Sequence, residues 1–468
     1  MSYFGREHMF LVVAISLAGA LALGRPAGAA AQSASDSSYA PISYWGEFSP
    51  PSDSTQAVFR DHGRAAWEWP LFVPYSVIAL PLRGLRLGMG AGIRWADRAD
   101  LFRFLNIVPV PRGAVPSFDY SSQAGFTFGL NYYIGIGSPK NPLRARAGYS
   151  TAQWQRYTIG AMLNRGGKWE MQLGAGYRVR PNLRFYGIGP QTRVADLSFY
   201  EDERNWAGAI VRRRIGRRSF IGVLAAFSSV TTRLPSAGHE PTLPEKFPDV
   251  ISAPGFNRRS EGVMVRIGAN LNGTKKASNP GRGTIIGATA GVFQSTNQDD
   301  VSFIAYRSEF QQFIPLWHTK RTLAVRAYLN WLDNTGSIDI PFQRLFINEA
   351  PDQFRGYTGA RWRDRGITGL TLEYRFPFMA DDLENAFGID TALLLDVGQV
   401  FRRVENIAIN DLTYSYGVGW RAYLDPHFVG TMELMWSDEG FQFRLSTQQL
   451  FQFSKDVLYN GKEETVIH

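Results

Sequence analysis

Apolar and polar residues alternate one by one along many stretches of this sequence, and this alternation constrains the fold more than any other feature. In residues 369–378 every second side chain is apolar: Leu370, Leu372, Tyr374, Phe376 and Phe378. A period of two is typical of a β-strand with one apolar and one polar face. The polar face carries charges of both signs, so it belongs either on a protein surface or in a polar lumen.

The same alternation recurs from residue 123 onward. Clear examples occupy residues 126–134, 168–180, 263–271 and 322–331. We count about fifteen such runs, and because an antiparallel single-chain barrel usually has an even number of strands, we expect about sixteen. We expect the strand that this count misses near residues 184–198.

A membrane barrel explains the pattern better than a soluble β-sandwich or propeller does. Aromatic residues stand at the ends of the runs, as membrane interfaces favour; they are Tyr132, Trp169, Tyr177, Trp331, Trp420 and Trp436. Only a closed sheet can pair all of its backbone groups inside a bilayer. The predicted fold is therefore all-β, a transmembrane antiparallel β-barrel of about 16 strands with a short N-terminal periplasmic segment.

The N-terminal region predicts export. Residues 9–24 form an apolar run, and Ala29 and Ala31 supply a small-residue cleavage site, so residues 1–31 are expected to be a signal peptide. A single membrane anchor is the alternative, for which the run is short. We expect residues 32–115 to be a leader with short amphipathic helices, which either cap the barrel or lie against anionic lipid. The barrel is expected at residues 116–453 and a C-terminal tail at residues 454–468.

Several motifs in the last third occur in a characteristic order. They are Pro341–Phe346, Phe354-Arg355-Gly356-Tyr357, the strand that contains Glu373-Tyr374-Arg375-Phe376-Pro377, and Leu395–Phe401 with Asp396 and Gly398. In this order they resemble the barrel domain of the BamA/TamA-type bacterial surface antigen superfamily. The resemblance implies that Arg355, Gly356 and Tyr357 form a loop-lock motif on the sixth extracellular loop, which folds back into the lumen. It also implies five strands after that loop, at about residues 366–378, 389–401, 412–424, 428–437 and 440–453.

The chemistry of the loop-lock motif can be argued from the residues as well. Glu373 and Asp396 share the polar phase of their strands, so both carboxylates are expected to point inward and to be the lumen partners of the loop. Arginine can bind them through planar, two-point contacts that lysine does not reproduce. Gly356 permits a tight turn and a close approach to the wall, and Tyr357 can pack while its hydroxyl finds a partner. The alternative is that Arg355 is a solvated loop charge and Asp396 faces water.

The sequence departs from the family pattern in three places. The glycine pair usual ahead of the loop tip is replaced around Asn348 and Glu349. Phe451 and Phe453 resemble the C-terminal assembly signal, but further residues follow them. The leader is too short and too rich in proline for a polypeptide-transport-associated (POTRA) domain, so the resemblance implies a POTRA-less branch and puts capture of clients in doubt.

The resemblance implies a protein of the bacterial cell outer membrane that acts in the insertion or translocation of proteins, with lipids as an open alternative cargo. The implied mechanism is a weak seam between the first and last strands, expected at Gln123–Gly135 and Gly440–Phe453. The implied partners are outer-membrane lipids and either unfolded outer-membrane proteins or periplasmic partner proteins.

A passive outer-membrane pore with weak anion preference is the alternative function. Arginines are expected to line the lumen; the set is Arg178, Arg266, Arg326, Arg375 and Arg421. They either attract anions or neutralise inward carboxylates in an ion-pair network. No histidine pair has metal-ligand spacing and no nucleophile or nucleotide motif occurs, so we expect no enzyme activity, catalytic residue, metal or cofactor. The charges are interleaved rather than gathered on one patch, so no nucleic-acid partner is expected.

Overall fold

The computed structural model describes residues 113–121, 124–135, 141–236, 238–249, 256–274, 280–297, 300–316, 321–348, 353–379, 387–424 and 427–446. The expected signal peptide, most of the expected leader, the tail, and Phe451 and Phe453 lie outside these residues. No helix within the described part of the chain is both long and apolar enough to span a membrane.

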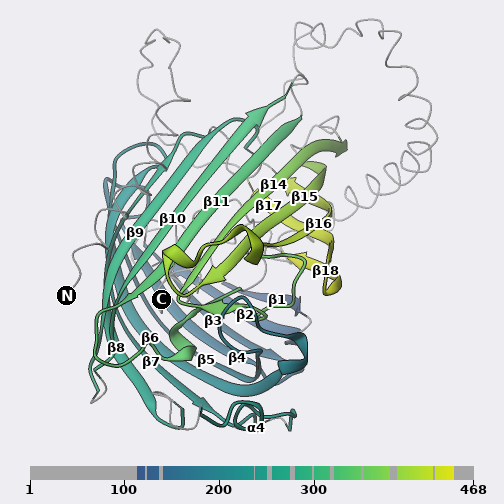
Figure 1. Cartoon of the computed structure of the whole chain (residues 1–468). Coiled ribbons are helices and arrows are strands. Elements are labelled where there is room, and N and C mark those ends of the chain that lie inside the picture. The colour runs from purple at the N-terminus through teal and green to yellow at the C-terminus, as the bar shows by residue number, and fades with distance from the viewer. Residues whose placement is uncertain are drawn as a thin grey trace, which may run out of the picture. The chain divides into compact units, whose positions relative to one another are not determined.

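One antiparallel sheet of 16 strands makes up most of the described chain, which confirms the predicted architecture (Figure 1). Each strand pairs with its neighbour in sequence, apart from a separate two-stranded sheet of β12 and β13 between β11 and β14. The strands are β1 (Gly113–Ser121), β2 (Gly125–Gly135), β3 (Pro142–Ser150), β4 (Gln155–Leu163), β5 (Trp169–Phe185), β6 (Ser198–Arg214), β7 (Phe220–Arg233), β8 (Arg259–Asn272), β9 (Gly283–Ser295), β10 (Ser302–Pro315), β11 (Thr322–Asn334), β12 (Phe346–Ile347), β13 (Arg363–Asp364), β14 (Gly366–Met379), β15 (Phe387–Phe401), β16 (Thr413–Leu424), β17 (His427–Ser437) and β18 (Gly440–Ser446).

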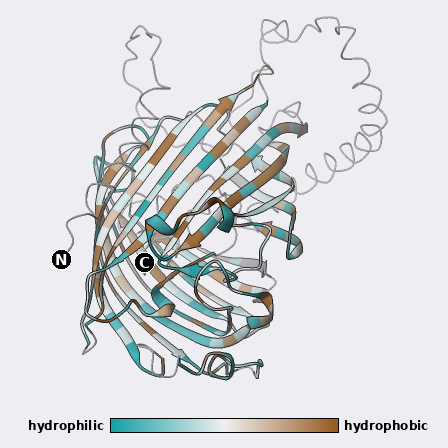
Figure 2. Ribbon diagram, in the orientation of Figure 1, coloured by the Kyte–Doolittle hydropathy of each residue, from teal (hydrophilic) through white to brown (hydrophobic). Residues whose placement is uncertain are grey.

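The two faces of the sheet follow the sequence alternation, as the colouring of the strands in Figure 2 illustrates. On β11 the buried side chains are Thr322, Ala324, Arg326, Tyr328 and Leu332, and the apolar residues between the first four lie on the outer face. The outer face of β2 is exposed and apolar at Phe126, Phe128, Leu130, Tyr132 and Ile134. This arrangement places an apolar surface toward lipid and a polar surface toward the lumen.

The long connections, which carry short helices, lie at one end of the sheet together with several short ones. In chain order they are residues 122–124, 151–154, 186–197 with the 3₁₀ helix η3 (Val194–Asp196), 234–258 with α4 (Leu243–Lys246), 296–301, 335–365 with η5 (Phe342–Arg344), 402–412 with η6 (Val404–Asn406) and η7 (Ile409–Asp411), and 438–439. The segment 335–365 is the sixth of them, the position that the family resemblance implies. We call it loop 6, and five strands of the large sheet, β14–β18, follow it as expected.

Loop 6 folds into the lumen. Its side chains Phe342, Arg344, Arg355, Tyr357 and Trp362 are all buried. Its apolar residues belong to one core cluster with Phe185 and Tyr200 from β5 and β6, Phe293 and Phe303 from β9 and β10, and Val400 from β15. The loop thus contacts walls on different sides of the sheet.

Two expectations about the strands are wrong. The first strand is β1 (Gly113–Ser121), ahead of the residues expected to form the seam, so the edges of the sheet are β1 and β18. The alternation of β1 is interrupted by Pro116, which an edge strand tolerates because one side of its backbone needs no ladder partner. No strand occupies residues 186–197, where Gly187 and Gly189 adopt positive φ angles of 102° and 104° that a regular strand does not allow.

Candidate functional site: the docking of loop 6 in the lumen

Arg355 of loop 6 and Asp396 of β15 form a two-point ion pair. The Nε of Arg355 donates to Oδ2 of Asp396 at 2.8 Å, and Nη2 donates to Oδ1 at 2.7 Å. The backbone N–H of Arg355 also donates to Oδ2, at 3.1 Å. Asp396 therefore fixes both the side chain and the backbone at the tip of the loop.

Two further carboxylates meet the same guanidinium. The Nη1 of Arg355 donates to Oε1 of Glu373 on β14 at 2.8 Å and to Oε1 of Glu433 on β17 at 3.0 Å. The other oxygen of Glu373 accepts from Nε of Arg375 at 2.8 Å. Three strands thus supply one carboxylate each to a single loop arginine.

This cluster is closed to solvent. Only 1% of the Arg355 side chain is exposed, and its three carboxylate partners are all buried. Burial by itself lowers the pKa of Arg355, but Asp396, Glu433 and Glu373 outweigh burial and hold that pKa well above its usual range. Removing one member would leave a buried charge without its partner, which costs several kcal/mol more than losing a surface pair.

The two residues after Arg355 rest on β16 and the β17–β18 turn. The N–H of Gly356 donates to Oγ of Ser415 at 3.2 Å, and Oγ of Ser437 donates to the carbonyl of Gly356 at 2.9 Å. A Cβ at position 356 would collide with the Cβ of Ser415. Glycine is required here because the backbone lies directly against the wall.

The hydroxyl of Tyr357 reaches the turn between β17 and β18. It donates to Oδ1 of Asp438 at 2.5 Å and also lies 3.3 Å from the carbonyl oxygen of Tyr414. Burial and the neighbouring Asp438 carboxylate raise the pKa of Tyr357, so the hydroxyl stays a donor. The expected polar partner of this tyrosine is therefore present.

The spacing of Asp396 and Gly398 on β15 has a steric reason. Both point inward, Asp396 to Arg355 and Gly398 to the preceding loop residue, Phe354. A Cβ at position 398 would lie 2.5 Å from Cε1 of Phe354 and would also meet the carbonyl oxygen of Thr368. The motif therefore provides a charge for the arginine and an open space for the aromatic ring beside it.

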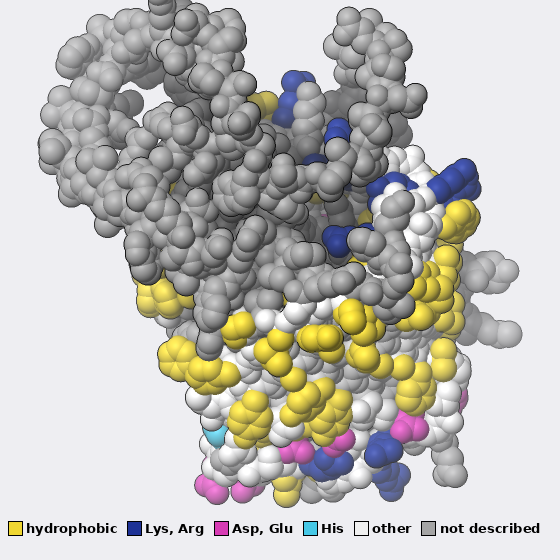
Figure 3. Space-filling view, turned by 180° about the vertical axis from the view of Figure 1, so that it is seen from behind, with side chains coloured by type: hydrophobic (Ala, Val, Ile, Leu, Met, Phe, Trp, Pro, Cys, Tyr) yellow, Lys and Arg dark blue, Asp and Glu magenta, His cyan; other side chains and the backbone are white. Residues whose placement is uncertain are grey.

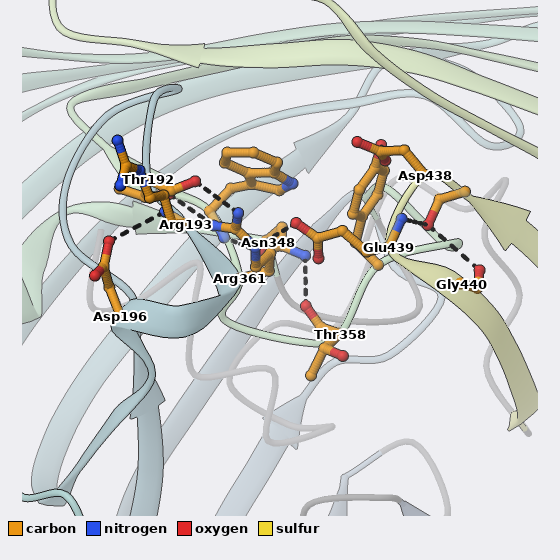
Figure 4. Close-up of polar contacts among 12 residues, drawn as sticks. Thr192, Arg193, Asp196, Asn348, Thr358, Arg361, Asp438, Glu439 and Gly440 are labelled. Atoms are coloured by element: carbon orange, nitrogen blue, oxygen red, sulfur yellow. Dashed lines mark hydrogen bonds and ion pairs between the residues drawn. The ribbon is translucent and has the colours of Figure 1, made fainter.

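Arg361 spans the lumen end, as Figure 4 shows. Its Nε donates to Oε1 of Glu439 in the β17–β18 turn at 2.6 Å, and its Nη1 and Nη2 donate to Oγ1 and the carbonyl of Thr192 at 2.6 and 2.7 Å. Its guanidinium lies over the ring of Trp362 at 4.0 Å. Arg361 therefore connects the last turn of the sheet to the loop between β5 and β6.

Asn348 closes loop 6 on itself at the point where the family's glycine pair is replaced. Its Oδ1 accepts from the N–H of Trp362 at 2.6 Å, and its Nδ2 donates to the carbonyl of Thr358 at 3.1 Å. The backbone of Asn348 also pairs with Trp362 and Ala360. An asparagine side chain thus joins the two arms of the loop.

Two other arginines attach loop 6 to the β5–β9 side of the sheet. Arg344 donates to Oγ of Ser260 at 2.9 Å and to Oγ of Ser228 at 3.2 Å. Arg363 donates to the hydroxyl of Tyr200 at 2.7 Å. The loop is therefore held on two sides, by carboxylates on β14–β17 and by hydroxyl and carbonyl groups on β6–β8.

The five arginines expected to line the lumen are all buried on the inner face. Arg178 pairs with Asp202 at 3.7 Å, Arg326 with Glu309 at 3.0 Å and Arg375 with Glu373 at 2.7 Å. Arg421 lies opposite Asp390 in the pairing of β15 and β16. Arg266 lies on β8 opposite Gly291 of β9. Arg178, Arg326 and Arg375 therefore belong to ion pairs with inward carboxylates, which is the arrangement of the network interpretation.

Sequence reasoning missed several residues that hold the loop. Glu433 stands at an inward position of β17, between Met432 and Leu434, and this phase was a usable signal. Asp438, Glu439, Ser415 and Ser437 gave no comparable signal, because turn acids and strand serines are usually solvated. Within the described part of the chain, no group of three or more His, Asp or Glu residues could hold a metal ion.

Comparison with known proteins agrees with this geometry. Residues 237–424 match the Omp85 superfamily domain, a stretch that includes loop 6, β14 and β15. A search of the curated proteins finds no match.

Two solved structures are similar in fold. BamA from Haemophilus ducreyi lacking POTRA domains 1-3 aligns over 71% of this chain and 69% of its own, with 13% sequence identity and a TM-score of 0.52. CdiB from Acinetobacter baumannii aligns over 73% of this chain and 57% of its own, with 11% identity and a TM-score of 0.43. The family match over residues 237–424 and the likeness in fold to BamA lead to the conclusion that this stretch, which contains the docked sixth loop, is an Omp85 superfamily domain within an outer-membrane β-barrel.

Proposed function

We propose that this barrel inserts or translocates proteins at the outer membrane, and that loop 6 is a releasable brace for its C-terminal strands. The observation that carries the proposal is the set of three carboxylates around Arg355, because Glu373, Asp396 and Glu433 come from β14, β15 and β17. One loop residue therefore joins three of the last five strands. The proposed clients are unfolded outer-membrane proteins, with lipids as the alternative cargo, and the proposed action is non-enzymatic.

The chemistry of this attachment suits a brace that must be released. The tip of loop 6 around Arg355 is held on the C-terminal strands by ion pairs and hydrogen bonds, which water can replace when the tip leaves, whereas other residues of the loop belong to the apolar core cluster. A contact made only by apolar side chains would expose apolar surface to water on release, and this exposure would oppose the release. A polar brace can therefore be strong when docked and still be exchangeable.

The edges of the sheet supply the proposed exit. β1 and β18 are the two edge strands of the sheet. They lie far apart in the sequence but contact each other in the structure, and this contact is the seam. Ser437, Asp438 and Glu439, which contact loop 6, directly precede β18. We infer that docking of loop 6 steadies the β17–β18 hairpin, and that undocking favours opening between β18 and β1.

A cysteine scan can test this role because the native chain contains no cysteine. Pairs placed on β1 and β18 should cross-link, and closing the seam should block assembly of client barrels and cell growth until reductant is added. The matched control is A114C/Y132C, since these residues are register partners within the continuous part of the sheet. If seam cross-links leave growth and assembly normal, the exit between β1 and β18 is excluded.

Single-channel recording tests the pore alternative. A braced insertion barrel should show a small, unsteady conductance that rises in Arg355→Ala, since the tip of loop 6 then leaves its site on the wall of the lumen. A large, steady, anion-selective current that Arg355→Ala leaves unchanged would favour the pore and contradict the brace.

A further inference from the structure

A second surface, unconnected with loop 6, lies at the opposite end of the sheet. Three neighbouring connections there, residues 164–168, 215–219 and 273–282, join β4 to β5, β6 to β7 and β8 to β9. The N–H of Arg214 donates to the carbonyl of Lys168 at 2.8 Å, and the N–H of Asn272 donates to Oγ of Ser219 at 2.9 Å. These hydrogen bonds place the described ends of the three connections side by side.

This surface is strongly basic. We call it the basic rim and define it by six residues: Arg165, Lys168, Arg213, Arg217, Arg218 and Arg282. Five of them are exposed, and Arg218 is half-buried with its Nη1 near the carbonyl of Thr274 at 3.3 Å. The segments 164–169, 213–219 and 273–282 contain no aspartate or glutamate. Glu170, next to the first of these segments, is buried and paired with Arg212 and Arg214, so the exposed charges of the three segments are positive.

The basic rim adjoins the lipid-facing surface directly. Exposed apolar side chains lie just below it on β5–β8; they are Trp169, Val211, Ile221, Val223 and Leu271. Arg213 shares the outer face with Val211, and its guanidinium lies over the ring of Trp169 at 5.7 Å. Figure 3 shows basic side chains beyond the hydrophobic band at the upper end of the molecule, whereas acidic and basic side chains are mixed at the lower end.

This sequence of aliphatic, indole and guanidinium groups matches the layers of a bilayer from acyl chain to headgroup. Tryptophan favours the interface, and arginine stems can lie along apolar surface while their charged ends reach phosphate. Because the rim is on the end opposite to loop 6, it faces the periplasmic leaflet of the outer membrane. We propose that the basic rim binds the phosphates of anionic phospholipids in that leaflet and so holds strands β4–β9 at a fixed depth in the membrane.

Lipid retention can test the rim directly. The full chain is reconstituted in bilayers with equal amounts of phosphatidylglycerol and phosphatidylcholine, and the lipids that remain bound on release are counted by native mass spectrometry. We expect the wild type to retain phosphatidylglycerol in preference to phosphatidylcholine. In R165Q/R213Q/R217Q this preference should fall at least about ten-fold, since each surface cation raises the affinity for anionic lipid roughly five-fold. The preference should also weaken at high salt.

The matched control removes three exposed arginines from the opposite end, R193Q/R258Q/R403Q, and should keep the preference. If the triple rim variant does not assemble, R213Q and R217Q alone should each lose roughly five-fold. An equal loss in the control, or an unchanged preference in the rim variants, would overturn the proposal. Loss of poly-glutamate binding with an unchanged lipid preference would also overturn it and assign the rim to an acidic protein.

Discussion

The guanidinium of Arg355 lies 3.0 Å from the carboxylate of Glu433, which belongs to the last strand but one of the sheet. This contact extends the attachment of loop 6 beyond β14 and β15 to the hairpin that forms one edge of the sheet. The loop and that edge are therefore linked by this buried ion pair, in addition to the ion pair between Arg361 and Glu439.

Arg355→Lys should release loop 6 almost as effectively as Arg355→Ala. A lysine ammonium cannot make the two-point contact with Asp396 while also reaching Glu373 and Glu433. The contacts that lysine does not replace leave buried carboxylate oxygens without this partner, which is costly. We expect docking to weaken by about 3–5 kcal/mol for alanine and by somewhat less for lysine. Limited proteolysis within loop 6 measures this, with Arg403→Lys as the control because Arg403 pairs with Glu405 at an exposed site outside loop 6.

Asp396→Asn should be more damaging than Glu433→Gln. Asp396 accepts three hydrogen bonds from Arg355, whereas Glu433 accepts one. Since hydrogen bonds to charged groups contribute about 1.5–3 kcal/mol each, the thermal midpoint of the assembled barrel should fall further for Asp396→Asn. Equal midpoints for the two variants would contradict this ranking.

Gly398→Ala should displace the loop tip without changing any charge. The added methyl group would meet Phe354 Cε1 at 2.5 Å and the carbonyl of Thr368 in the adjacent strand. Overpacking of this kind typically costs about 1–3 kcal/mol. Gly148→Ala is the matched control, because a Cβ there has its nearest neighbour at 3.8 Å. Proteolysis of loop 6 should accelerate only in Gly398→Ala.

Arg361→Ala should loosen the β17–β18 turn. The substitution removes the contact with Glu439 at 2.6 Å and the two contacts with Thr192 across the lumen end. We expect faster amide hydrogen exchange in residues 438–446, while β6 and β7 keep their protection. Arg402→Ala, which removes an exposed arginine, should leave exchange in that segment unchanged. Unchanged exchange in Arg361→Ala would show that the turn does not depend on Arg361.

Docking of loop 6 should weaken as the pH rises from about 4, the ordinary pKa of aspartate. Burial raises the pKa of Asp364 in the loop, and burial likewise raises the pKa of Glu439. The docked state therefore binds protons that the released state gives up, so these two groups favour docking at low pH and lose that contribution as the pH passes through their raised pKa values.

Asp364→Asn should flatten this pH dependence and strengthen docking at neutral pH, because the amide needs no proton to remain uncharged. Hydrogen exchange in loop 6, corrected for the intrinsic effect of pH, is the measurement. A wild-type loop that becomes better protected with rising pH would reverse the sign and refute the prediction.

Local pattern was sufficient to predict the strands after loop 6 and the direction of their side chains. Strands β14 to β17 begin and end within two residues of their expected positions, and Glu373 and Asp396 are both buried on the inner face. The reason is that a period of two ties each side chain to one face, so a single correct strand sets all its inward residues. The pattern failed at β1, where an edge position tolerates Pro116 and a weak alternation.

The sequence by itself determined the class of fold, the strand faces and the arginine at the loop tip, because these depend on neighbours along the chain. Only the tertiary structure decided which groups that arginine meets. Glu433 lies 78 positions from Arg355, and Thr192 lies 169 positions from Arg361. Such contacts depend on how the sheet curves and on where loop 6 enters the lumen, and no local period carries that information.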